Sequence, residues 1–198
     1  MKGDYFYEPE EVNGRLKGLH TVYPTLKKEW DSNHYGLEWR DFTSYQKKTI
    51  EESNQGHEIQ YDEYFTAPLA TEDSKWSIAP LFFNRTPYPR NVEVLPKLAK
   101  TMTWLGETMY VGMVKLAPDA SLGWHYDPDP NSHTQRLRCQ LPFTAEICTL
   151  SVKNESRPQA EGKLMIFQSS AMHKVENMGR FDRISLIFDV FREGPGIL

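Results

Sequence analysis

The sequence has little cysteine, no long apolar run and no excess of positive charge. Its two cysteines, Cys139 and Cys148, are too few for a disulfide framework and are not spaced as a Cys-x-x-Cys metal or redox pair. No apolar run approaches the roughly 20 residues that a membrane-spanning helix needs, and residues 1–5 are too polar to begin a signal peptide. The formal net charge of −4 provides no basic field for nucleic acid. We therefore expect a cytoplasmic protein with no membrane or nucleic-acid partner.

The sequence does contain enough apolar and aromatic side chains for one core. Its 198 residues are 39% hydrophobic and 13% aromatic, so we expect a single domain over residues 1–198. Within it, we expect residues 76–192 to form the main fold and residues 1–75 to form an N-terminal elaboration. Short strands and loops are predicted at the start of that elaboration, with a turn at 16–19 and a helical segment at 25–30.

The middle of the chain predicts one strand and one helix. Residues 76–83 are apolar and indicate a buried strand, with Pro80 at an edge or a bulge. A helix is predicted over residues 92–104, ending at Gly106, and Pro96 favours a start at that residue because proline is tolerated in the first turn. The apolar residues that recur at helical spacing are Leu95, Leu98, Met102 and Leu105.

From residue 108 onward, short apolar runs alternate with turn residues, which is typical of an antiparallel sandwich or barrel. So many short strands favour a mainly β fold with flanking helices, a double-sheet jelly roll that holds a ligand site inside one end. A long turn is predicted over residues 154–162. The predicted strands are residues 108–116, 122–127, 135–142, 145–153, 163–168, 173–177 and 182–192.

His125 and Asp127 form a His-x-Asp pair, and His173 follows about fifty residues later. Two neutral imidazoles and one carboxylate are the ligands of a mononuclear non-haem iron(II) site, because they leave the opposite positions open for a co-substrate and oxygen. Alternation places both side chains of the pair on one side of an extended segment, with Tyr126 turned away. We predict that His125, Asp127 and His173 are the metal ligands and the catalytic centre. For Asp127 the alternative is an Asx turn, because it precedes Pro128.

The strand predicted at 135–142 carries polar residues on one face. Arg136, Arg138 and Gln140 share that face, while the alternating residues are apolar. Either this face is exposed to solvent, or it lines an anion-binding cavity. For Arg136 itself, a surface charge is the simpler interpretation.

The strand predicted at 182–192 begins with Arg183 and Ser185 on one face, opposite a face that is apolar throughout. A 2-oxoacid that chelates iron through its keto oxygen and one carboxylate oxygen needs a fixed cation for its distal carboxylate. Arginine suits this task because its planar fork donates two parallel hydrogen bonds and stays charged inside a cavity. The Ser185 hydroxyl adds a candidate third donor.

A run of motifs in the second half of the chain resembles the aspartyl/asparaginyl β-hydroxylase family of iron(II)- and 2-oxoglutarate-dependent oxygenases. The resemblance covers roughly residues 76–192, and most specifically 109–192. In chain order, the matching elements are His125, Arg136-Leu137-Arg138, the segment 161–167, His173-Lys174-Val175, Arg183 and Asp189-Val190-Phe191.

The resemblance implies a cupin-like double-stranded β-helix. It also implies that iron is bound at His125 and His173, and that 2-oxoglutarate is held by Arg183 with help from Arg138. Two positions depart from the family pattern. Gln140 occupies the place of a family histidine near the co-substrate, where its amide can still donate a hydrogen bond. The second departure is a carboxylate in the first metal motif, at the position of Asp127, which animal members lack.

The function that the resemblance implies is hydroxylation of an amino-acid side chain, free, peptidyl or carrier-bound. Iron(II), 2-oxoglutarate and O₂ are the implied cofactor and co-substrates, and succinate and CO₂ the co-products. We expect a small-molecule or peptide substrate, with residues 1–75 and the 128–135 loop shaping its site, and leave the oligomeric state open. The alternatives are another metal-dependent cupin enzyme and a ligand-binding jelly-roll module without catalysis. Dependence on metal and 2-oxoglutarate distinguishes the three.

Overall fold

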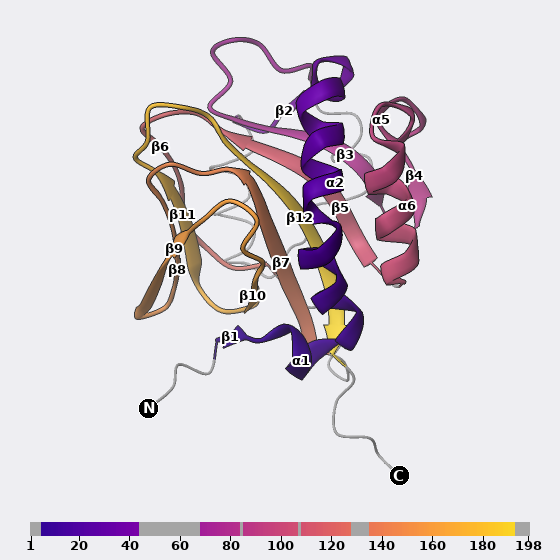
Figure 1. The fold of residues 1–198 in the computed structure, drawn as a ribbon. Coiled ribbons are helices and arrows are strands. Elements are labelled where there is room, and N and C mark those ends of the chain that lie inside the picture. Colours follow the sequence, from indigo (N-terminus) through magenta and orange to yellow (C-terminus); the bar gives the residue numbers. More distant parts are fainter. Residues whose placement is uncertain (1–4, 44–67, 84, 107, 128–134, 193–198) are drawn as a thin grey trace.

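Two antiparallel sheets face each other in the computed structural model, which describes residues 5–43, 68–83, 85–106, 108–127 and 135–192 (Figure 1). The larger sheet has the order β1-β10-β7-β12-β5-β3-β2, with β4 beside β3, and the smaller sheet has the order β6-β11-β8-β9. From β5 onward the chain passes repeatedly between the two sheets, which confirms the predicted mainly β jelly roll with flanking helices.

The bounds of the elements follow the chain. The helices are α1 (Pro9–Val12), α2 (Lys17–Asn33), α5 (Pro89–Val94) and α6 (Pro96–Leu105), with short 3₁₀ turns at Gly14–Leu16 and His34–Gly36. The strands of the larger sheet are β1 (Phe6–Tyr7), β2 (Arg40–Asp41), β3 (Trp76–Phe83), β4 (Thr86–Pro87), β5 (Thr108–Leu116), β7 (Gln135–Thr144), β10 (Met165–Gln168) and β12 (Arg183–Arg192). Those of the smaller sheet are β6 (Ala120–His125), β8 (Cys148–Val152), β9 (Glu155–Gln159) and β11 (His173–Asn177).

The helices cover the outer face of the larger sheet (Figure 1). Their apolar residues pack on the outward side chains of β3, β5, β7 and β12 in one buried cluster, which removes a large apolar area from water. A second cluster lies between the two sheets. Among the described residues, no helix is long and apolar enough to cross a membrane.

Strand β12 illustrates how alternation builds both the core and the inner cavity. One face of the strand is apolar and packs under the helices, while the other face points between the sheets. The polar face of β7 behaves in the same way, so its arginines line the interior and are not displayed to solvent. The helix-facing residues of β12 are Ile184, Leu186, Phe188 and Val190, and the inward ones include Arg183, Ser185, Ile187 and Asp189.

The N-terminal segment differs from its prediction. Residues 17–33 form one helix of 17 residues, α2, in place of a turn and a shorter helical segment. Pro24 lies inside it, although an interior proline costs a helix about 3 kcal/mol. Leu19, Leu26 and Trp30 are buried against the helix-facing side of the sheet, and this packing stabilises a helix that local propensity disfavours.

Two further boundaries differ. Residues 92–104 were predicted as one helix, but the structure has two helices, α5 and α6, separated by Leu95. Helix α6 starts at Pro96, the start that this proline favoured. It ends at Gly106, whose φ is +98°, as expected. Residues 155–159, predicted as part of a long turn, form β9. This strand lies at the edge of the smaller sheet, where a proline such as Pro158 is tolerated. Strand β3 was predicted correctly, with an irregular register after Pro80.

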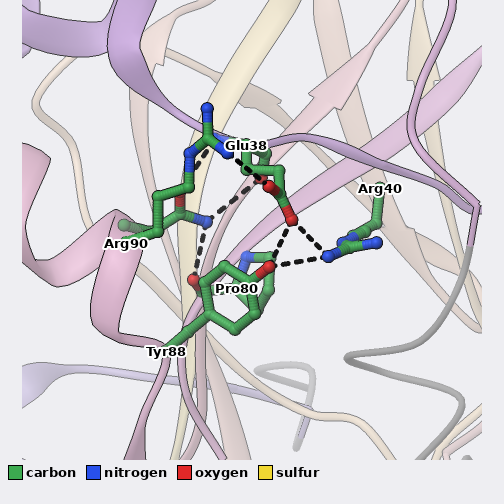
Figure 2. Close-up of polar contacts among 6 residues, drawn as sticks. Glu38, Arg40, Pro80, Tyr88 and Arg90 are labelled. Carbon is green, nitrogen blue, oxygen red and sulfur yellow. Dashed lines mark hydrogen bonds and ion pairs between the residues drawn. The ribbon is translucent and has the colours of Figure 1, made fainter.

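Residues 37–43 are attached to the sheet by a polar network. Asn91 is fully buried, accepts a hydrogen bond from the Glu38 backbone at 2.8 Å, and donates to the Pro80 carbonyl at 2.9 Å. Figure 2 shows the Glu38 carboxylate accepting hydrogen bonds from Tyr88, Arg40 and Arg90. The Tyr88 hydrogen bond, with the charges of the two arginines, holds the pKa of Glu38 below its usual value despite the opposing effect of burial.

Because the pKa of Glu38 is lower in the folded state, its ionised carboxylate stabilises the fold above its ordinary pKa of 4.5, and this contribution is lost as pH falls below that value. We predict that Glu38→Gln lowers the free energy of unfolding at pH 7, and that the difference from wild type shrinks between pH 4.5 and pH 3. Urea denaturation of both proteins at pH 7, pH 4.5 and pH 3 measures the difference in their free energy of unfolding. Glu93→Gln, on an exposed residue of α5, is the matched control. A difference independent of pH would contradict the assignment.

Candidate metal centre and anion pocket

Three candidate metal ligands meet where the smaller sheet ends. His125 is the last residue of β6, and it pairs directly with His173, the first residue of β11. Asp127 follows two residues later, and its backbone N–H donates to the Ser169 carbonyl at 2.9 Å, which ties this segment to the turn before β11. The ligand atoms of the three side chains all lie within 4.8 Å of one another.

A hydrogen bond from Nδ1 to a backbone carbonyl orients each of the two imidazoles. His125 Nδ1 lies 2.7 Å from the Gly123 carbonyl, and His173 Nδ1 lies 2.9 Å from the Ala171 carbonyl. A carbonyl can only accept, so each Nδ1 carries a proton, and in the neutral form of each ring the lone pair lies on Nε2. A hydrogen bond from the far nitrogen to a carbonyl is the arrangement that typically orients metal-binding histidines.

The protonation states also suit a divalent cation. Burial and the neighbouring His125 lower the pKa of His173 to about 3. For Asp127, burial acts to raise the pKa, but electrostatic interactions, the largest of them with the positive charge of Arg138, outweigh it and hold the pKa well below the usual range. At neutral pH the group therefore offers an anionic carboxylate and neutral imidazole. This donor set fits iron(II), which is bound elsewhere by two histidines and one carboxylate.

Arg138 bridges two carboxylates beside this centre. Its Nε and Nη2 donate to the two oxygens of Asp189 at 2.8 and 2.9 Å, and its Nη1 donates to Asp127 Oδ2 at 2.6 Å. The Asp189 side chain is fully buried, and Arg136, also buried, lies with its Nε 3.9 Å from it. Arg136 is therefore no surface charge. The predicted help from Arg138 in holding 2-oxoglutarate stays a prediction.

Arg183 is held differently. Its Nε donates to Gln159 Oε1, and its Nη2 donates to Gln140 Oε1 at 2.8 Å, while Gln159 Nε2 also donates to Gln140 Oε1 at 2.6 Å. Arg183 is only 2% exposed, yet it makes no ion pair with any acidic residue that the structure describes. The Ser185 hydroxyl on the same face of β12 is buried and has no hydrogen-bond partner within the described ranges.

One cavity, whose volume is about 460 Å³ when the space open to solvent at its mouth is included, is lined by both histidines and by Arg183. Its walls are mostly apolar, and its polar side chains are His125, Arg138, Gln140, His173 and Arg183. The cavity thus brings together two of the three predicted metal ligands, His125 and His173, and three of the four predicted co-substrate residues, which are Arg138, Gln140 and Arg183. The apolar walls are formed by Trp76, Val114, Leu116, Leu122, Val175 and Ile187.

Sequence reasoning missed two buried residues of this region. Gln159 lies on β9, which was predicted to be a turn, so its inward direction was not visible. Asp189 was recognised only as part of a closing motif. It lies four residues after Ser185 and two after Ile187, so strand alternation places it on the face of Arg183, which was a usable signal.

Comparison with known proteins gives one family and several distant folds. The model of the aspartyl/asparaginyl beta-hydroxylase family matches residues 23–193 and so includes most of α2. No curated protein matches the sequence.

The similar solved structures are distant ones. A 2OG-Fe(II) oxygenase family oxidoreductase from Burkholderia pseudomallei is 13% identical, with a TM-score of 0.42, over 61% of this chain and 69% of that one. A predicted oxalate decarboxylase from Thermotoga maritima is 16% identical, with a TM-score of 0.40, over 58% of this chain and 79% of that one. The Cnp3 cupin domain of Schizosaccharomyces pombe is 10% identical, with a TM-score of 0.39, over 61% and 68%. Similarity at this level carries no conclusion about function.

The pairing of Arg138 with Asp189 leads to a prediction about stability. Arg138→Met leaves the buried Asp189 carboxylate without its main partner, so the free energy of unfolding should fall by about 3–5 kcal/mol. In the double variant Arg138→Met/Asp189→Leu, the loss should be smaller than the sum of the two single losses by about 1 kcal/mol or more. Urea denaturation of all four proteins measures the coupling, and strictly additive losses would contradict it. The exposed Arg180, changed to Met, is the control and should alter stability little.

Proposed function

Because the chain belongs to the aspartyl/asparaginyl β-hydroxylase family, and is therefore an oxygenase of the hydroxylase type, we propose that it uses iron(II) and 2-oxoglutarate to hydroxylate an amino-acid side chain. The substrate is a free amino acid, a peptide residue or a carrier-bound residue, and succinate and CO₂ are the co-products. His125, Asp127 and His173 are the proposed metal ligands. Iron(II), when bound, couples oxidative decarboxylation of 2-oxoglutarate to insertion of an oxygen atom into a C–H bond.

The observation that carries this proposal is the buried, unmatched charge of Arg183. Burial lowers the pKa of Arg183 to about 10, so the guanidinium is still charged at neutral pH. A buried charge without an opposite charge is costly, and a ligand carboxylate would remove that cost. Arg183 lines the same cavity as His125 and His173, so one dianionic molecule can contact both ends.

The other side chains near the cavity would bind the co-substrate, pack against it or orient a metal ligand. The Ser185 hydroxyl, which lacks a protein partner within the described ranges, supplies a further donor for the distal carboxylate. The apolar wall around Leu122, Val175 and Ile187 packs on the methylene groups of the bound acid and excludes water. Arg138 holds the Asp127 carboxylate in place and so orients one ligand of the metal. A cupin enzyme that binds no anionic molecule in this cavity has no need for the buried Arg183.

The direct test is succinate formation. Iron(II)-loaded protein should convert 2-oxoglutarate to succinate, with a rate that rises when one member of a pool of amino acids and short peptides is present. His173→Ala should abolish turnover, because it removes one of three ligands. Lys174→Ala, on the half-buried opposite face of β11, is the control and should turn over like wild type. No metal-dependent succinate, together with no 2-oxoglutarate binding, would contradict the proposal.

Replacing Arg183 tests the co-substrate assignment separately from the metal. Arg183→Met keeps an unbranched apolar side chain but removes the charged guanidinium, so the dissociation constant for 2-oxoglutarate should rise about 100-fold. Metal affinity should stay within about twofold of wild type, since Arg183 contacts none of the proposed ligands. Anaerobic calorimetric titration of the metal and then of 2-oxoglutarate measures both quantities. Arg180→Met, an exposed arginine on the turn before β12, is the matched control, and equal affinity of Arg183→Met and wild type for 2-oxoglutarate would refute the assignment.

A further inference from the structure

The two arginines that line the cavity are held by groups of different charge. Arg138 donates to the carboxylates of Asp189 and Asp127, so its positive charge is matched inside the protein. Arg183 donates to the amides of Gln140 and Gln159, which are neutral. Both arginines are fixed in direction, but only Arg183 keeps an unmatched charge.

The ring formed by Arg183, Gln140 and Gln159 has only one consistent arrangement of donors. A guanidinium can only donate, so both amide oxygens must face Arg183. Gln140 Oε1 accepts from Arg183 Nη2 at 2.8 Å and from Gln159 Nε2 at 2.6 Å, which turns its own Nε2 away from the ring. Gln159 thus satisfies Arg183 Nε and also helps to fix the direction of the Gln140 amide.

The N–H groups of Arg183 and Gln140 that make no hydrogen bond to a described residue are still free to donate. Within the part of the chain that the structure describes, neither Arg183 Nη1 nor Gln140 Nε2 has a hydrogen-bond partner, and both residues line the cavity. The occupied Nε edge of the guanidinium leaves its terminal edge for a carboxylate, which can accept two parallel hydrogen bonds there. Such a set of donors selects an anion.

Gln159 is well placed to act through Arg183 without touching the ligand. It is 4% exposed, does not line the cavity, and belongs to β9, where it pairs with Cys148 of β8. Its side chain therefore reaches from the smaller sheet to an arginine of the larger sheet. A glutamate here would have the same shape, but its charge would cancel that of Arg183.

We propose that Gln159 is a positioning residue for the co-substrate: it holds Arg183 with a neutral acceptor, so that the arginine is fixed in direction while its charge stays available for the distal carboxylate. This inference rests on the proposed function, since it takes 2-oxoglutarate as the anion. It assigns Gln159 no contact with the ligand or the metal.

The test compares Gln159→Glu, Gln159→Leu and wild type as full-length proteins. Anaerobic calorimetry on iron(II)-loaded protein gives dissociation constants for 2-oxoglutarate and for glutarate, a probe that lacks the keto group and so reports on the arginine end. Gln159→Glu should weaken binding of both acids by about tenfold or more, and Gln159→Leu should weaken it by about tenfold, the effect of losing a hydrogen bond to a charged group. Iron(II) affinity should stay within about twofold of wild type in both variants.

Thermal unfolding and kinetics separate positioning from structural support. Gln159→Glu pairs the buried Arg183, so its melting temperature should equal or exceed that of wild type while its affinity for 2-oxoglutarate falls. The KM for 2-oxoglutarate should rise, with kcat at saturation within about twofold of wild type. Ser151→Ala removes a partly buried hydrogen bond of 2.8 Å between the hydroxyls of Ser151 on β8 and Ser156 on β9. This variant is the control for local packing and should not alter binding.

The outcomes are distinct. Wild-type affinity for 2-oxoglutarate in Gln159→Glu would overturn this inference and leave the proposed function standing. A parallel fall of affinity and melting temperature in Gln159→Glu would also overturn it, because that pattern indicates general damage to the fold. If wild type itself binds no 2-oxoglutarate, the proposed function fails and the inference fails with it.

Discussion

A charge that is buried between two sheets must be matched by an opposite charge or by hydrogen-bond partners, and this constraint governs the interior of the protein. Strands β7 and β12 turn their apolar faces to the helices and their polar faces inward. On the inner side, Arg136 and Arg138 lie against Asp189, and Arg138 also reaches Asp127. Among these arginines, Arg183 meets the constraint by hydrogen bonds alone, because only neutral amides of the described residues hold it. The positive charge of Arg183 is therefore open to an anion, and Arg183 lines the same cavity as the two histidines of the candidate metal centre.

The helices take part in this arrangement from the other side of the sheet. Leu19, Leu26 and Trp30 of α2 pack in the same cluster as Leu186 and Phe188 of β12, directly behind the strand that carries Arg183. Since the family model begins at residue 23, most of α2 belongs to the region shared with the family. The helix layer is thus a support for the inner face of the sheet, and its packing fixes the position of the site indirectly.

The sequence predicted most of the residues that the structure brings together at the candidate site, because their signals are local. The spacing of His125 and Asp127, and the alternation that puts Arg183 and Ser185 on one face, depend only on neighbouring residues in an extended strand. The partner of each arginine was not predictable, because it depends on strand register between distant segments. Arg138 meets Asp189 only because β7 and β12 pair with those two residues opposite each other. From sequence alone, both Arg138 and Arg183 were therefore assigned to the binding of 2-oxoglutarate. In the structure the charge of Arg138 is matched by carboxylates, whereas Arg183 is held by neutral amides.

The failures at the level of the fold have a similar origin. The α2 helix contains Pro24, which local propensity penalises, and it forms because burial of its apolar side chains outweighs that penalty. Strand β9 carries Pro158 and charged residues, and it forms because an edge position tolerates both. In each case tertiary contacts override the local signal, and Gln159 was missed together with its strand.

In the proposed function, one molecule of 2-oxoglutarate lies between the metal centre and Arg183. The decisive experiment is a crystal structure of the protein with 2-oxoglutarate and manganese(II), a redox-inert substitute for iron(II). We expect manganese to be bound by His125, Asp127 and His173, and the distal carboxylate of the acid to lie on the terminal edge of Arg183. An acid bound elsewhere, or a metal bound without these three residues, would contradict it.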